Sequence, residues 1–101
     1  MTSKSSTLEV NLPPDCAGSF SVLEFTDSLR RKLDLKPKQV ILDGSQIYRL
    51  GSVMIGTLAH FQKEIRSWGG ELVLKSFTMM GRQPFAISRL TESFTWNDEA
   101  H

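Results

Sequence analysis

Short apolar runs alternate along this chain with longer segments of helical periodicity, and this alternation restricts the fold more than any other feature. Residues 40–42 read Val-Ile-Leu, a continuous apolar run typical of a central strand covered on both faces. From Ser52 onward apolar residues recur at steps of three and four, which predicts a helix, and Gly69 and Gly70 can end it in a left-handed conformation. Its apolar stripe comprises Ile55, Leu58, Phe61, Ile65 and Trp68. The apolar run within residues 71–75 predicts the next strand.

Residues 8–33, which precede the central strand, also predict a strand followed by a helix. Residues 8–12 alternate apolar and polar side chains, as in a strand with one buried face, and Pro13 with Pro14 ends it. Helical spacing follows and predicts an amphipathic helix. Its apolar stripe comprises Val22, Phe25, Leu29 and Leu33. The basic run at residues 30–32 lies in the last turns, where positive charge offsets the helix dipole, so a solvated face is the favoured interpretation.

A third helix is predicted near the C-terminal end, because Pro84 suits a first helical turn leading to Phe85, Ile87 and Leu90. Strands that alternate with helices favour a parallel sheet. We therefore expect an α/β fold with a mixed, mostly parallel sheet flanked by about three to four helices. A chain of 101 residues suits one domain, here residues 1–101, with residues 1–7 and 97–101 as flexible tails.

Composition argues against several classes of function. Twelve basic and eleven acidic residues leave a net charge of +1, too little to attract nucleic acid. No apolar segment approaches the roughly 18 residues of a membrane-spanning helix, and residues 1–7 lack the apolar core of a signal peptide, so we expect a cytoplasmic protein. Cys16, His60 and His101 are far apart in the sequence, so we expect neither a metal site nor a cofactor.

The segment from Val40 to Leu74 resembles the core of STAS domains, the family of bacterial anti-sigma-factor antagonists and of the cytoplasmic ends of sulfate transporters. In that family a buried strand ends in Asp, an Asp-Ser-Ser-Gly-Leu-Gly type turn opens a helix, and Gly-Gly ends it. Here Asp43 ends the strand, Ser52 occupies the phosphorylatable position and residues 55–56 match Leu-Gly. Two departures are Gly51 in place of the preceding Asp and Val-Met at residues 53–54.

Further matches extend this resemblance over most of the chain. Residues 69–74 match the family's helix exit, and Phe94 fits the hydrophobic residue near its C-terminal helix. The Leu-Pro-Pro-Asp segment at residues 12–15, followed by a helix, looks closer to the shorter chemotaxis-type and lipid-asymmetry STAS variants.

The resemblance implies a regulatory module without enzymatic activity, of the anti-sigma-factor-antagonist type. Its partner would be a serine-kinase anti-sigma factor or the ATPase of a transporter, and its control point would be phosphorylation of Ser52. The partner would dock on the loop and helix that begin near Ser52. The implied docking residues are Asp43, Tyr48, Arg49, Gly51, Ser52, Met54 and Ile55.

Each of these residues also has a purely structural interpretation. Ser52 is more simply a helix N-cap than a phosphoacceptor. Asp43 could equally satisfy backbone N–H groups of a turn. Cys16 suits a small buried apolar role and Trp68 a core role, while Trp96 stays undecided between exposure and burial.

Two other classes of function compete with the binding module. One is a small α/β ligand-binding protein or enzyme with a pocket at the carboxyl ends of the strands. The other is a structural subunit that acts by oligomerising. Nucleotide-binding fingerprints are absent from the sequence, which argues against an autonomous NTPase.

Overall fold

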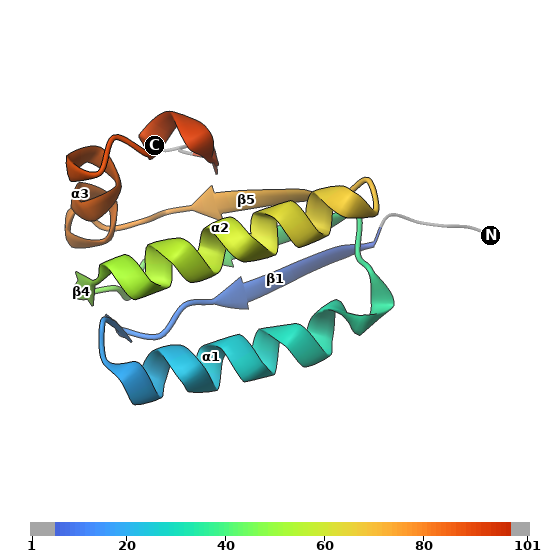
Figure 1. Cartoon of the computed structure of the whole chain (residues 1–101), viewed down its shortest axis with the longest axis horizontal. Helices are drawn as coiled ribbons and strands as arrows, with labels where there is room; N and C mark the ends of the chain where they lie inside the picture. The colour runs from blue at the N-terminus through green and yellow to red at the C-terminus, as the bar shows by residue number, and fades with distance from the viewer. Residues whose placement is uncertain (1–5, 98–101) are drawn as a thin grey trace.

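The computed structural model describes residues 6–97, and strands and helices alternate along them (Figure 1). The main elements, in chain order, are β1 (Thr7–Asn11), β2 (Asp15–Cys16), α1 (Ser19–Lys32), β3 (Gln39–Asp43), β4 (Arg49–Leu50), α2 (Ser52–Ser67), β5 (Glu71–Lys75), α3 (Met79–Ile87) and β6 (Thr95–Asn97). Two 3₁₀ turns, η1 (Leu33–Leu35) and η2 (Thr91–Ser93), follow α1 and α3. Thr7 and Asn97, expected in flexible tails, belong to strands; residues 1–5 and 98–101 lie outside the described residues.

Four strands form the main sheet in the order β1-β3-β5-β6, and each neighbouring pair is parallel. The α/β prediction and the central place of β3 are thereby confirmed. β6 was not predicted, because three residues are too few to show a strand period. β6 lies beside β5 with Trp96 opposite Leu74, so the two side chains lie on the same face of the sheet.

The core lies on one face of the sheet, against α1 and α2. Both predicted helical stripes are buried there, apart from Trp68, which is half-buried and packs against the core. The strands contribute Val40, Leu42, Leu72 and Leu74, each at most 1% exposed. In Figure 1, α2 passes in front of the strands and α1 runs alongside it, below β1 in this view.

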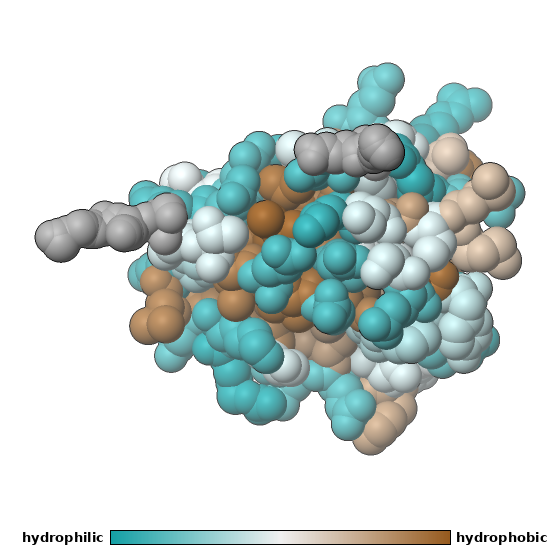
Figure 2. All heavy atoms as spheres, turned by 180° about the vertical axis from the view of Figure 1, so that it is seen from behind, coloured by the Kyte–Doolittle hydropathy of each residue, from teal (hydrophilic) through white to brown (hydrophobic). Residues whose placement is uncertain are grey.

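The expectation that residues 40–42 are covered on both faces is wrong. Along β3 buried residues alternate with half-buried ones, and Ile41 points away from the helices. Seen from behind, this second face has apolar side chains at its centre with hydrophilic ones around them (Figure 2). An ion pair between Lys75 Nζ and Glu9 Oε2 (3.0 Å) joins β5 to β1 across β3 on this face. Within residues 6–97 the fold therefore has two layers, the sheet and the helices on one of its faces, and on the other face an ion pair crosses the strands where a second helical layer would lie.

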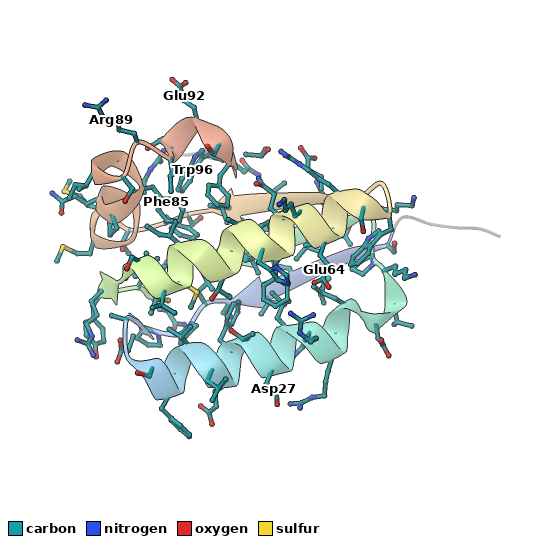
Figure 3. The ribbon with its side chains drawn as sticks, in the orientation of Figure 1. Asp27, Glu64, Phe85, Arg89, Glu92 and Trp96 are labelled. Carbon is teal, nitrogen blue, oxygen red and sulfur yellow. The ribbon has the colours of Figure 1, made fainter. Side chains whose placement is uncertain are left out.

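The third helix begins earlier than predicted, at Met79, so Pro84 lies inside it and not in its first turn. Thr78 explains the difference, because its side chain accepts a hydrogen bond from Gly81 N (3.1 Å) and caps the helix. The Phe85 ring of α3 packs edge to face against Phe77, Phe94 and Trp96. Figure 3 shows Phe85 and Trp96 close together beside α3. Trp96 Nε1 donates to Thr91 O at 2.7 Å, so this residue is an anchor for β6 and not part of a polar tail.

Candidate functional site

A second, two-stranded sheet brings the N-termini of α1 and α2 together. β2 pairs in parallel with β4, with Asp15 opposite Arg49 and Cys16 opposite Leu50. Gly51 N donates to Cys16 O at 3.2 Å, which continues this pairing to the start of α2. A Cβ atom placed on Gly51 would lie 3.5 Å from the Ala17 Cβ. The segments that lead into the two helices therefore lie close together, with room for little more than one methyl group between them.

An ion pair closes the outer end of this small sheet. Arg49 donates from Nε to Asp15 Oδ1 (2.8 Å) and from a terminal nitrogen to Oδ2 (3.0 Å). Asp15 Oδ1 also accepts from the backbone N–H groups of Ala17 and Gly18, both at 2.9 Å. The Arg49 guanidinium and then these two N–H groups hold the pKa of the Asp15 carboxyl well below its usual range. The same contact raises the pKa of Arg49.

An apolar groove of about 420 Å³ runs between α1 and α2 from this point. Its lining consists of Ala17, Ser19, Val22, Leu23, Thr26, Val53 and Thr57. Leu23 and Val53 are each 66% exposed, and Phe20, one helical turn before Leu23, is 72% exposed. Large apolar side chains gathered at one surface point to a binding function, because exposing them to water is unfavourable.

Ser52 lies beside this groove as the first residue of α2. Its side chain is exposed, as predicted, but its interpretation as an N-cap is wrong: Gly51 occupies the cap position and no side-chain hydrogen bond caps the helix. The hydroxyl therefore lies at the positive end of the helix dipole and takes no part in capping.

The other predicted docking residues divide into surface and core. Tyr48 is 57% exposed and the Arg49 side chain 55% exposed, so both are accessible next to Ser52. Met54 and Ile55 are 0% and 5% exposed, so assigning them to a binding surface is wrong. Helical geometry is the reason, because these two positions follow Ser52 on the side of α2 that faces the sheet.

Asp43 Oδ1 accepts from Ser45 N at 2.8 Å, which supports its structural interpretation as part of a turn.

Sequence reasoning missed the exposed apolar residues at the groove and next to it. Phe20, Leu23 and Val53 are apolar residues that fall outside the buried helical stripes, and this mismatch is the signal that could have found them. Asp15 was missed as well, because its partner Arg49 is 34 positions away in sequence.

Within residues 6–97, His60 and Cys16 lie in different surroundings. His60 lies on the α2 surface, 4.0 Å from Glu64, which Figure 3 places between the two helices. Cys16 is fully buried, as predicted, and burial raises the pKa of its thiol to about 11. Among residues 6–97, no cluster of three His, Cys, Asp or Glu side chains could hold a metal ion. None of the helices in this range is long and apolar enough to cross a membrane.

A comparison with known protein families finds a match. The family model of the STAS domain matches residues 19–101, from the start of α1 onward. A search of the curated proteins finds no match to the chain. The family match covers most of the sequence, and it includes both helices that flank the groove and Ser52 at its edge. The chain belongs to the STAS domain family.

Proposed function

We propose that this chain is a non-catalytic regulatory module of the anti-sigma-factor-antagonist type that docks a partner protein at one defined surface. The docking face consists of Phe20, Leu23, Tyr48, Ser52 and Val53. The observation that carries the proposal is the apolar groove between α1 and α2, which opens beside an exposed serine at a helix start. STAS domains are in general regulatory or interaction domains.

The partner that we propose is a serine-kinase anti-sigma factor or the ATPase of a transporter, met in the cytoplasm. Either could place apolar side chains against Leu23 and Val53, which are each 66% exposed. An aromatic ring at Tyr48 beside an apolar groove is typical of an interface hot spot. The Asp15–Arg49 ion pair then has a positioning role, because it holds the two helix N-termini that frame the groove.

Phosphorylation of Ser52 is the control that we propose for this contact. A phosphate there would lie at the positive end of α2, where backbone N–H groups and the helix dipole favour an anion. It would also add roughly two negative charges beside Val53. Those charges would have to be desolvated against an apolar partner, so the modified form should bind weakly.

The competing pocket at the carboxyl ends of the strands has less support. The loops that follow β3 and β5 are joined there by hydrogen bonds from Gly44 N to Lys75 O (2.9 Å) and from Thr78 N to Gly44 O (3.3 Å). A Cβ atom on Gly44 would lie 2.5 Å from the Phe77 ring, which shows how tightly these loops pack. A catalytic or ligand site would need space at this point.

Affinity capture with paired variants tests the docking face. The unmodified chain should retain one stoichiometric partner, identifiable by mass spectrometry as a serine kinase or an ATPase, and this partner is then purified for titration. Leu23→Asp should reduce its affinity at least tenfold, about 1.4 kcal/mol, whereas Leu35→Asp should not. Leu35 is a matched control because it is 89% exposed but lies beyond the other end of α1.

A comparison of Ser52→Asp with Ser52→Ala in the same titration tests whether negative charge at this position weakens partner binding. We expect the aspartate variant to bind more weakly than the alanine variant. Equal affinities for Leu23→Asp and Leu35→Asp would refute the docking face, and equal affinities for the two Ser52 variants would refute the charge control.

A further inference from the structure

A second surface, on the other side of α1, has features that the docking face does not use. β1 is an edge strand, with β3 on one side and no strand on the other within residues 6–97. Leu12 N donates to Asp43 O at 2.9 Å, so even-numbered residues direct their backbone groups to β3. Backbone groups alternate in direction along a strand. The N–H and C=O groups of Thr7, Glu9 and Asn11 therefore point to the open edge.

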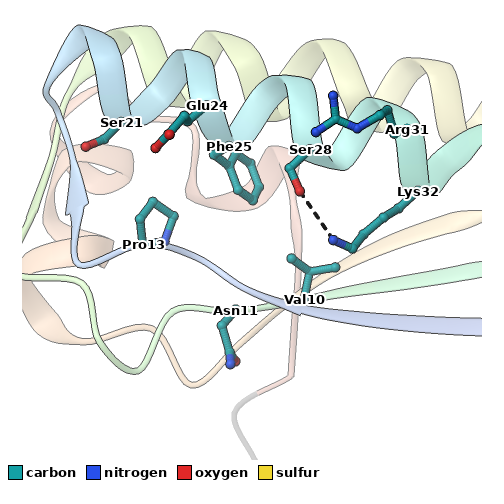
Figure 4. Close-up of a pocket in the computed structure, with 9 residues that line it drawn as sticks. All are labelled: Val10, Asn11, Pro13, Ser21, Glu24, Phe25, Ser28, Arg31 and Lys32. Atoms are coloured by element: carbon teal, nitrogen blue, oxygen red, sulfur yellow. Dashed lines mark hydrogen bonds between the residues drawn. The ribbon is translucent and has the colours of Figure 1, made fainter.

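A hollow of about 460 Å³ lies between this edge and α1 (Figure 4). Val10 and Phe25 supply its apolar part, and the figure shows Phe25 pointing from α1 toward the strand. Glu24 lies nearer Pro13, while Lys32 lies at the opposite end above Val10. The hollow thus combines apolar contact, a charged group at each end and a row of unpaired backbone groups.

The two cations on this side of the hollow differ in their partners. Arg31 is already paired with Asp27, at 2.9 Å. Lys32 Nζ donates to Ser28 Oγ at 3.2 Å, and among residues 6–97 no carboxylate neutralises it. Its ammonium group is therefore the one that an incoming carboxylate can pair with.

We propose that this hollow binds an extended acidic peptide segment of another protein, which adds to β1 as a further strand. The open backbone groups of β1 would supply main-chain hydrogen bonds, and the hollow would select side chains at alternate positions. One apolar side chain would contact Val10 and Phe25. Two residues along, about 7 Å away, an Asp or Glu would reach Lys32.

A second copy of this chain fits the hollow less well than such a peptide. The β1 residues that point to the helix side of the sheet are Leu8, Val10 and Leu12. A paired copy of β1 would therefore present only apolar side chains to the hollow and no carboxylate to Lys32. The charge at Lys32 favours a segment with an alternating apolar and acidic pattern.

Nuclear magnetic resonance with a defined probe tests this proposal. The probe is a short acetylated and amidated peptide with Val-Thr-Glu at its centre and threonines on both sides. Its addition should shift the amide signals of Thr7, Glu9 and Asn11 and slow the hydrogen exchange of these amides. The same peptide with Val-Thr-Lys at its centre should bind more weakly.

Charge reversal identifies the contact. Lys32→Glu should weaken binding of the Glu peptide by about fivefold to tenfold and strengthen binding of the Lys peptide. Lys63→Glu makes the same change of charge on α2, outside the hollow, and should leave both affinities unchanged. Leu23→Asp should also leave them unchanged, which separates this site from the docking face.

Three results would overturn the proposal: no change at the β1 amides, equal effects of Lys32→Glu and Lys63→Glu, or β1 shifts that depend on protein concentration without peptide. The last result would assign the edge to self-association.

Discussion

Replacing Gly51 by aspartate should stabilise this protein, although it adds a side chain at a helix start. Gly51 is the N-cap of α2, and its backbone is extended (φ −112°, ψ 174°), so any residue can adopt it. A Cβ atom there would meet the Ala17 Cβ at 3.5 Å, an ordinary van der Waals contact. Since α2 has no side-chain cap, a carboxylate at this position gains hydrogen bonds that no present group makes.

The magnitude follows from two contributions. An aspartate cap is better than a glycine cap by a few tenths of a kcal/mol. A carboxylate at the N-terminus of a helix contributes a further ~0.3–1 kcal/mol through the helix dipole. Together they predict about 1 kcal/mol, which raises the Tm of a domain of this size by about 4–8 °C.

Thermal and urea unfolding measure the effect, with Gly51→Asn and Gly51→Ala as matched variants. We expect the order of stability to be Asp, then Asn, then Gly, then Ala, because asparagine caps without charge and alanine does not cap. The advantage of Gly51→Asp over Gly51→Asn should be present at pH 7 and lost as the pH falls below about 4, where the carboxyl takes up its proton. A Gly51→Asp protein no more stable than Gly51→Ala would refute the reasoning.

Three further predictions concern Phe85, Asp15 and Cys16. Phe85→Ala should cost about 3–5 kcal/mol in urea unfolding, because Phe85 is fully buried among aromatic rings, whereas Met80→Ala at an exposed position of the same helix should cost far less. Asp15→Asn should destabilise the protein at pH 7, because the pKa of the Asp15 carboxyl is lower in the folded than in the unfolded state. The stabilisation by this carboxylate is present above its unfolded pKa of about 3.9 and is lost as the pH falls through its folded pKa. Equal urea midpoints of the two proteins at pH 7 would contradict this reasoning. Cys16 should react slowly with Ellman's reagent at pH 8 and rapidly in urea, because burial raises its pKa to about 11; fast reaction in the folded protein would show that the thiol is accessible.

Local periodicity determined the longer helices and strands of the first three quarters of the chain, but not the two-residue strands β2 and β4. The stripes of α1 and α2 are visible in the sequence because burial against a sheet requires apolar residues at helical spacing, and the structure buries them as predicted apart from Trp68. The parallel sheet followed from the alternation of strands and helices. The place of Ser52 at the start of α2 is predicted by the helical spacing that begins there, and its exposure is implied by the resemblance to STAS domains.

Tertiary structure decided what depends on residues far apart in the chain. Trp96 of β6 packs against Phe77 and Phe85. A three-residue strand has no local pattern from which this packing could be predicted. The pairing of Asp15 with Arg49, and the groove that it frames, depend on two helix starts brought together by the small sheet.

Single elements could be predicted better than surfaces, because an element depends on residues near in sequence and a surface on residues that meet only after folding. A helix or strand records in its own period which face is buried, so sequence alone determined α1, α2 and the strands β1, β3 and β5, their order and the position of Ser52. A surface such as the docking face is made by neighbours that contact only after folding. The helical period already placed Ile55 on the buried side of α2, whereas only the tertiary structure brought Leu23 and Val53 to one groove, where both are exposed.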